Sequence, residues 1–366
     1  MKSTLLSEYT HKFPAVRGIQ AHRPCYIAMC PMRLIPKLFV FDEEVVPPEL
    51  RAQRRLNEAR IPDITNYLIE NSDSYTLSAI TASIDGPVQF EPFADTGPAA
   101  NLGLLSIGMD TQILVNDGQH RRKAIEQAIK EAHELGHDNI PVLFFVDEGL
   151  TRSQQMFADL NKHAVRPSDS LSTLYDHRES ASALARFVLE QVPCFKTLTD
   201  LEQTSLSKRS SKLFTLSAIK LASRSLLAKT AKDNISPEEM QLAASYWNQV
   251  CQCMPDWQDA LERKVSTCDL REQFIHAHGL GIAALGAVGA DLLRQKPSDW
   301  QAALQALVEV DWSRSNTALW RGRAMDAHGR LSKTRNNITL TANVIRKALG
   351  LELSAEDQSI EDQFKS

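Results

Sequence analysis

The pattern of apolar and polar positions changes its period near residue 117. The segment YTLSAITASI at 75–84 is rich in β-branched and aromatic residues and precedes the turn sequence Asp85-Gly86-Pro87; this predicts a strand. Shorter apolar runs at 102–107 and 112–115 predict two further strands, and IPVLFFV at 140–146 is typical of a buried one. The first third of the chain is therefore expected to build a sheet.

A helical period begins after Asn116-Asp117-Gly118. Apolar residues then recur on one face of a helix that starts at or just after Asp117: Ile125, Ala128, Ile129, Ala132 and Leu135. A second helix is predicted at 151–161, beyond the strand at 140–146. Alternating strands and helices indicate an α/β domain.

Strand-like runs disappear beyond about residue 166. Helical patterns cover 213–228, 237–250, 274–293 and 338–349, so the second half is predicted to be all α. We therefore expect an α/β domain at 1–165, a helical domain at 166–350 and an acidic tail at 351–366. Because residues 352–366 hold five acids and one lysine and little apolar surface, this tail is predicted to be loose.

Length and charge narrow the function. A chain of 366 residues exceeds what one compact core usually fills. The net charge of −4 argues against a protein coated in positive potential and leaves only regional basic patches for nucleic acid. The sequence shows neither an apolar signal segment nor a run long enough for a membrane span, which predicts a cytoplasmic protein without membrane contact.

The six cysteines, Cys25, Cys30, Cys194, Cys251, Cys253 and Cys268, are scattered along the chain. They form no CxxC pair at zinc-ribbon spacing. We therefore expect free thiols and no metal site, as suits a cytoplasmic protein.

Cations crowd the predicted helix start at 117–123. Arg121, Arg122 and Lys123 lie where unpaired amides already carry partial positive charge. An anion bound there by the backbone, the arginines, Gln119 and His120 would relieve that repulsion, and Gly118 would let it approach closely. In the alternative interpretation Asp117 is an N-cap, Gly118 is a turn residue, and the arginines are a solvated face pairing with Glu126.

A second basic region lies near the C-terminus. Between Trp312 and Lys347 the single acid Asp326 faces eight basic residues, a local charge of +7: Arg314, Arg321, Arg323, Arg330, Lys333, Arg335, Arg346 and Lys347. This asymmetry predicts a DNA-phosphate surface on which Trp312 and Trp320 would pack against sugars or bases. Alternatively, the arginines pair with acids elsewhere and the tryptophans lie in the core.

Two smaller clusters are further candidates for DNA contact. Arg51, Arg54 and Arg55 share one face if their segment is helical. Lys208, Arg209 and Lys212 precede a predicted helix. Each cluster would extend a phosphate surface or simply be solvated.

The segment NDGQHRRKAI resembles the signature of the DGQHR group, to which the DndB family of DNA phosphorothioation (sulfur modification) proteins belongs. The resemblance extends to RAQR at 51–54, to 75–86, to RSQQMFADLNKHAVRPS at 152–168 and to SKTRNNITLTANVIRKAL at 332–349. It therefore covers most of the chain and is far more specific than the short motif.

The DGQHR group is in turn similar to the ParB and sulfiredoxin superfamily, which places a strand-to-helix turn against nucleotide phosphates. The resemblance thus implies an α/β fold of that kind in the first domain. It also implies nucleotide or Mg²⁺ contacts at Asp159 and Asn161, for which a helix cap is the alternative. Gln119 replaces sulfiredoxin's reactive cysteine, so repair of oxidised peroxiredoxin is not expected.

The resemblance implies a DNA-binding transcriptional repressor of a bacterial phosphorothioation gene cluster. Its expected partner is double-stranded DNA at the cluster's own promoter, and a homo-oligomer is expected. The second hypothesis is a nucleoside triphosphatase with Mg²⁺, coupled to DNA nicking or defence, although no Walker A motif occurs and no catalytic residue is assigned. The third is an adaptor that binds the phosphorothioation enzymes.

Overall fold

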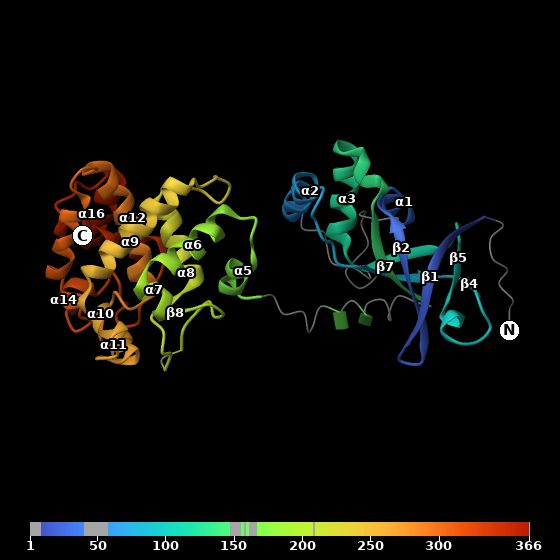
Figure 1. Cartoon of the computed structure of the whole chain (residues 1–366), viewed down its shortest axis with the longest axis horizontal. Coiled ribbons are helices and arrows are strands. Elements are labelled where there is room, and N and C mark those ends of the chain that lie inside the picture. Colours follow the sequence, from blue (N-terminus) through green and yellow to red (C-terminus); the bar gives the residue numbers. More distant parts are fainter. Residues whose placement is uncertain are drawn as a thin grey trace. The chain divides into compact units, whose positions relative to one another are not determined.

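The computed structural model describes residues 9–39, 58–146, 155–156, 159–160, 167–207 and 209–365. The chain divides into two compact units, residues 1–165 and 166–366, and we describe each by itself (Figure 1).

Unit 1 is built on a seven-stranded mixed sheet of order β4-β5-β1-β2-β7-β3-β6. All neighbouring strands are antiparallel except β3 and β7. The strands are β1 Thr10–Gln20, β2 Arg23–Pro31, β3 Ile80–Asp85, β4 Val88–Pro92, β5 Leu102–Gly108, β6 Gln112–Asp117 and β7 Asn139–Val146. The strands predicted at 102–107, 112–115 and 140–146 are confirmed.

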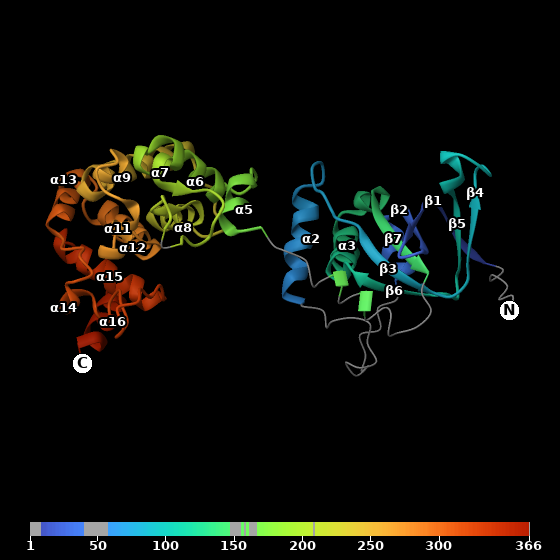
Figure 2. The same cartoon turned by 90° about the horizontal axis from the view of Figure 1, so that it is seen from below.

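Helices cover one face of this sheet (Figure 2). Ile140, Val142 and Phe144 alternate along β7 and are fully buried, as the pleat requires of strand residues that face a core. They share that core with residues of α1 Ile35–Leu38, α2 Ile61–Glu70 and α3 Gln119–Glu131. The predicted helix after residue 118 is thus confirmed, and its buried face fixes it on the sheet.

The opposite face carries an uncovered apolar row. Leu102, Val16 and Ile27 are lateral neighbours on β5, β1 and β2 and are 43%, 44% and 42% exposed. Outer positions of antiparallel sheets are usually polar. The row is therefore surface that the expected homo-oligomer would have available.

Three predictions for unit 1 need correction or lie outside the description. The strand predicted from residue 75 begins only at Ile80, and Tyr75 packs on the core without strand pairing. Helix α3 ends at Glu131, so Leu135 is buried from a short 3₁₀ helix, His133–His137. Of the helix predicted at 151–161, only 155–156 and 159–160 are described, and they are helical.

Unit 2 is helical apart from one short parallel strand pair, β8 Thr199–Asp200 and β9 Phe214–Thr215, which corrects the all-α prediction. Its helices are α5 Asp169–Tyr175, α6 Ser180–Gln191, α7 Pro193–Leu198, α8 Leu216–Leu226, α9 Pro237–Gln252, α10 Pro255–Leu261, α11 Thr267–Gln273, α12 Gly279–Gln295, α13 Trp300–Leu304, α14 Thr317–Trp320, α15 Arg335–Ala348 and α16 Ala355–Lys365.

Helix boundaries in unit 2 follow local chemistry. Helix α9 starts where predicted because Ser236 and Glu239 form a capping box. The helix predicted at 274–293 begins five residues late, because Phe274 forms a β-bridge with Ser313. The C-terminal residues predicted as a loose tail instead form helix α16, which lies on α15.

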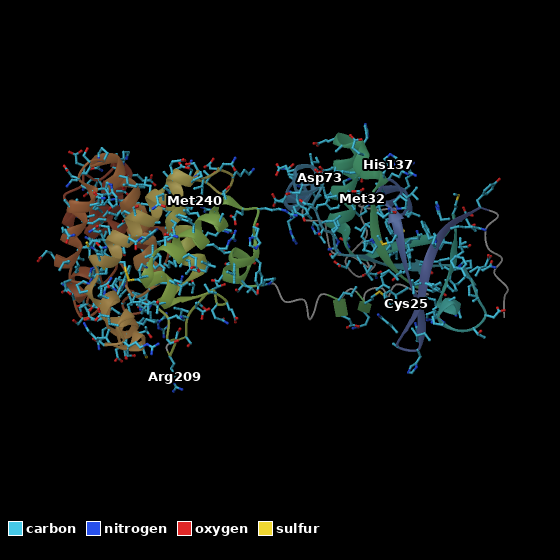
Figure 3. All side chains as sticks on the ribbon, in the orientation of Figure 1. Cys25, Met32, Asp73, His137, Arg209 and Met240 are labelled. Atoms are coloured by element: carbon cyan, nitrogen blue, oxygen red, sulfur yellow. A yellow bond between two sulfur atoms is a disulfide. The ribbon has the colours of Figure 1, made fainter. Side chains whose placement is uncertain are left out.

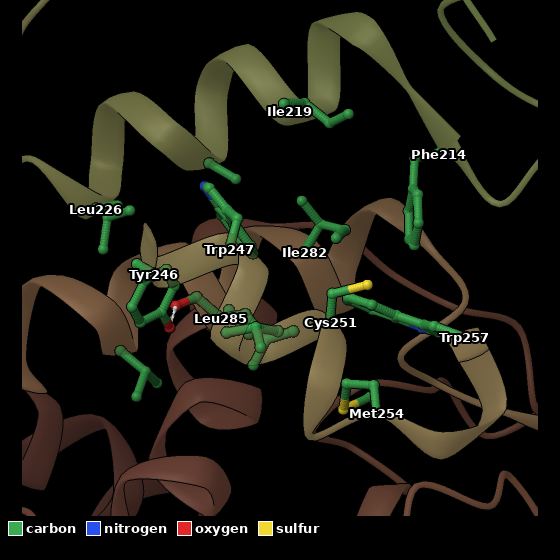
Figure 4. Packing of buried hydrophobic residues seen from close by; sticks show 14 of the residues in the cluster. Phe214, Ile219, Leu226, Tyr246, Trp247, Cys251, Met254, Trp257, Ile282 and Leu285 are labelled. Carbon is green, nitrogen blue, oxygen red and sulfur yellow. Dashed lines mark hydrogen bonds between the residues drawn. The ribbon is translucent and has the colours of Figure 1, made fainter. Parts of the chain in front are cut away.

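The core of unit 2 is rich in tryptophan (Figure 4). Trp247 donates to Ser223 Oγ at 3.0 Å, and Tyr246 donates to the Leu285 carbonyl at 2.7 Å, so the buried polar atoms of both side chains are paired. Trp312 and Trp320 stack on one another within the same core. The prediction that these two rings contact DNA is therefore wrong, and the core alternative holds.

Two cysteines of this core are paired. Cys194 on α7 and Cys251 on α9 form a disulfide, with their Cα atoms 6.3 Å apart. Among the other four, Cys25, Cys30 and Cys253 are buried and Cys268 is half-buried, none of them in a disulfide. The expectation of six free thiols is thus wrong for one pair, which spacing along the sequence could not reveal.

Gly286 allows α8 and α12 to meet closely. A Cβ on this residue would lie 2.4 Å from the Ala222 carbonyl oxygen, which is backbone and cannot swing away. We predict that Gly286→Ala lowers the stability of unit 2 by about 1–3 kcal/mol, because the helices must separate. Thermal unfolding followed by circular dichroism measures this. Gly279→Ala, where the nearest atoms are 3.4 Å away or more, is the control; equal melting temperatures would contradict the close-contact argument.

Candidate phosphate-binding surfaces

The turn at 117–118 joins β6 to α3. Gly118 is the N-cap of α3 and adopts φ 107°, a left-handed conformation that favours glycine. A Cβ there would also lie 3.0 Å from Ile80 Cγ1 and 3.1 Å from the Arg121 guanidinium. Because Gly118 occupies the cap position, Asp117 is not the N-cap, and no side chain of the cap residue satisfies the first amides.

The arginines of the turn are partly neutralised within the chain. Arg121 folds back over Gly118 and donates to Asp117 Oδ2 at 2.7 Å and to the Ala79 carbonyl at 3.0 Å. Arg122 donates to Glu126 Oε2 at 2.9 Å and to the Pro36 carbonyl at 3.1 Å. Burial raises the pKa of Glu126, but Arg122 and Lys123 outweigh it, so that the pKa is lowered overall. The pairing with Glu126 that the alternative interpretation proposed is present.

The same turn nevertheless has unmatched donors. Gln119 is 6% exposed, and its Nε2 has no hydrogen-bond partner. The buried Nε atoms of Arg121 and Arg122 also lack partners. Unmatched buried donors are rare and costly, and all three lie in the first turn of a 13-residue helix whose dipole favours an anion. A phosphate oxygen is the kind of acceptor that this turn lacks.

The other predicted contacts in unit 1 are only partly described. Asp159 Oδ1 accepts a hydrogen bond from Gln155 Nε2 at 2.8 Å. Asn161 and the cluster Arg51, Arg54 and Arg55 lie outside the described residues. Among the residues that the structure describes, no three His, Cys, Asp or Glu side chains are grouped so as to hold a metal ion.

Half of the basic segment in unit 2 is paired with helix α16. Arg323 is 8% exposed and donates to both carboxylate oxygens of the fully buried Glu361, at 2.6 and 2.7 Å. The other pairs are Lys347 with Glu361 at 2.5 Å, Arg335 with Glu356 at 3.0 Å and Arg346 with Asp357 at 3.5 Å. In this conformation Arg323 is therefore not exposed to DNA, contrary to the prediction.

The other four cations of that segment, Arg314, Arg321, Arg330 and Lys333, form no ion pair with any described residue. Lys333 Nζ lies 3.4 Å from the position of a Cβ on Gly279, the first residue of α12, and burial lowers its pKa. Arg314 donates to backbone carbonyls only, those of Arg271, Glu272 and Gly329. Lys333 and Arg314 thus bring positive charge near the start of α12, and neither forms an ion pair with a described residue.

Two further residues near the start of α12, Arg271 and His278, were not predicted from the sequence. Arg271 donates to the Leu206 carbonyl and has a buried Nε without a partner. His278, the N-cap of α12, makes no capping hydrogen bond and instead donates from Nε2 to the Arg271 carbonyl at 2.6 Å. Burial, reinforced by Arg271 and Arg314, lowers the pKa of His278 to about 4, so it is neutral at pH 7. The signal that could have found them is His278-Gly279-Leu280-Gly281 before an apolar helix.

The cluster at 208–212 is only partly described. Arg209 is exposed and projects from unit 2 (Figure 3). Lys212 Nζ donates to the Thr197 carbonyl at 2.6 Å, and Lys208 lies outside the described residues. The arrangement leaves Arg209 available to a phosphate.

The orphan amide of Gln119 gives a testable prediction. Gln119→Met keeps the side-chain volume and removes the unmatched donor, so the ligand-free protein should become more stable by about 1–3 kcal/mol. Adding inorganic phosphate should raise the melting temperature of the original chain more than that of the variant. Differential scanning fluorimetry with phosphate, and with chloride at equal ionic strength, measures both effects; a variant less stable than the original would show that the amide is satisfied.

No helix among the described residues is long and apolar enough to cross a membrane.

Comparisons with known proteins agree with the family resemblance. Neither the curated proteins nor the solved structures contain a match, so a fold like that of ParB stays a prediction. The model of the DndB family, described as DNA-sulfur modification-associated, matches residues 13–352. Since that match covers nearly the whole chain, the chain belongs to the DndB family.

Proposed function

We propose that this DndB-family protein is a DNA-binding transcriptional repressor of a bacterial DNA-sulfur-modification gene cluster, and that it binds double-stranded DNA at the cluster's promoter. The observation that carries the proposal is the group of cations at the start of α12. Arg271 and Arg314 act electrostatically on His278, the N-cap of α12, and Lys333 lies beside Gly279. None of these three cations forms an ion pair with a described residue. In a protein of net charge −4, such a local surplus favours contact with a phosphate backbone.

The turn at the start of α3 is the second part of the proposal. Its unmatched donors and its helix N-terminus suit one phosphate group. That phosphate belongs to DNA or to a nucleotide that sets the affinity for DNA. A nucleoside triphosphate with Mg²⁺ therefore stays a prediction, as does binding to the phosphorothioation enzymes, and no specific observation favours triphosphate hydrolysis.

DNA binding is tested by fluorescence anisotropy with a labelled duplex of the cluster's promoter and a shuffled duplex of equal composition. Between about 50 and 200 mM salt the affinity for both duplexes should fall steeply, because bound phosphates release counterions. The promoter should bind more tightly throughout. An affinity for DNA that does not change with the salt concentration would contradict the proposal. Phosphate release measured with ATP, GTP and CTP, with and without DNA, decides whether a bound nucleotide is hydrolysed.

One substitution tests the α12 cluster directly. Lys333→Gln should weaken binding equally on both duplexes and reduce the salt slope by about 1, because a phosphate contact carries no sequence information. Lys264→Gln is the matched control, since Asp259 and Glu262 already neutralise that lysine. If both variants bind like the original chain, the cluster is not part of the DNA interface.

A further inference from the structure

Helix α16 is an acidic segment that lies on a basic surface. It begins at Ala355, three residues beyond the last residue that the DndB family model matches. Its carboxylates contact four of the eight cations between Trp312 and Lys347: Arg323, Arg335, Arg346 and Lys347. The part of the chain that the family model matches thus contributes the cations, and the segment after it contributes the anions.

The contact between α16 and the rest of unit 2 is largely electrostatic. Among the side chains of the helix that are described, only Glu361 is fully buried, while the apolar side chains Ile360 and Phe364 are half-buried. The Arg323 guanidinium lies over the Phe364 ring, 4.3 Å from its centre, and donates two hydrogen bonds to the Glu361 carboxylate. Hydrogen bonds from Arg323, opposed by burial and aided by Lys347, lower the pKa of Glu361 to about 2. The helix therefore remains anionic where it touches the cations.

We propose that Arg323, Arg335 and Lys347 form a surface for DNA phosphates that α16 occupies within the same chain, so that α16 and DNA compete for it. The two oxygens of Glu361 accept from Arg323 in the forked geometry that a phosphodiester also satisfies. Arg346 would stay neutralised, because it also pairs with Asp291 of α12 at 2.7 Å. This inference rests on the proposed binding of DNA and adds its regulation.

Removal of α16 is the first test. The chain ending at Leu353 should bind the promoter duplex about tenfold more tightly than the full chain near 100 mM salt. Its salt slope should be steeper by about 2–3, which corresponds to three new phosphate contacts at about 0.9 each. A synthetic peptide of residues 354–366 added to the shortened chain should return the affinity toward that of the full chain.

Point variants keep the helix and separate its specific contacts from net charge. Glu361→Gln and Asp362→Asn each remove one negative charge from α16, but only Glu361 pairs with cations, whereas Asp362 accepts from Gln358. We expect tighter DNA binding from Glu361→Gln and little change from Asp362→Asn. Glu356→Gln, which frees the exposed Arg335, should have a smaller effect in the same direction and does not disturb a buried group.

The outcomes are distinguishable. Equal affinities for Glu361→Gln and Asp362→Asn, with Glu356→Gln unchanged, would overturn the competition even if the shortened chain does not fold, which circular dichroism reports. Binding by the full chain that truncation does not alter would overturn it while leaving the proposed function intact. Absence of DNA binding by every chain at low salt would overturn both.

Discussion

The buried ion pair between Arg323 and Glu361 determines how much positive charge unit 2 presents. Removing two charges from water is expensive, and replacing such a pair by apolar residues is often neutral for stability. Its main consequence is therefore structural: the Glu361 carboxylate contacts both Arg323 and Lys347 and so helps to attach the C-terminal helix to α15 and to the segment before it. With α16 in place, Arg314 and Lys333 near the start of α12 are among the described cations that form no ion pair with a described residue.

Both candidate surfaces lie at a helix start, where the first backbone amides have no partner within the helix. In α3 the constraint is visible in the backbone, because Gly118 adopts a left-handed conformation that brings the chain from β6 into the helix without a capping side chain. In α12 it is visible in packing, since a Cβ on Gly281 would lie 2.7 Å from His276 Cα. Neither N-cap residue, Gly118 of α3 or His278 of α12, makes a capping hydrogen bond from its side chain. Cations gather at both starts, so an external anion is the natural partner.

The parts of the fold that sequence could predict are those set by local periodicity. Strands β5, β6 and β7 were predictable because they are short apolar runs, and helix α3 was predictable because its apolar positions repeat with the helical period. The start of β3 was not, because Tyr75 and Thr76 favour extended structure without specifying a partner strand. Nor was α16, because Glu361 acquires its partner Arg323 from 38 positions earlier. Trp312 and Trp320 show the same limit: an aromatic residue beside arginines looks the same in a sequence whether it faces DNA or a core.

The number of basic residues in the candidate site was predictable from the sequence, but not which of them are free of an ion pair in the fold. Counting gave +7 between Trp312 and Lys347, yet α16 contributes carboxylates that pair with half of the eight cations. Those acids, Glu356, Asp357 and Glu361, lie beyond the counted window. A count of charges along a stretch of sequence therefore gives the largest number of cations that could face solvent, and the fold determines how many of them do. A phosphate and a carboxylate both offer an arginine a pair of oxygen acceptors. The carboxylates of α16 therefore bind the basic segment in the same way that a phosphate would. If this segment binds a phosphate backbone as proposed, α16 supplies an alternative partner for half of its cations within the same chain.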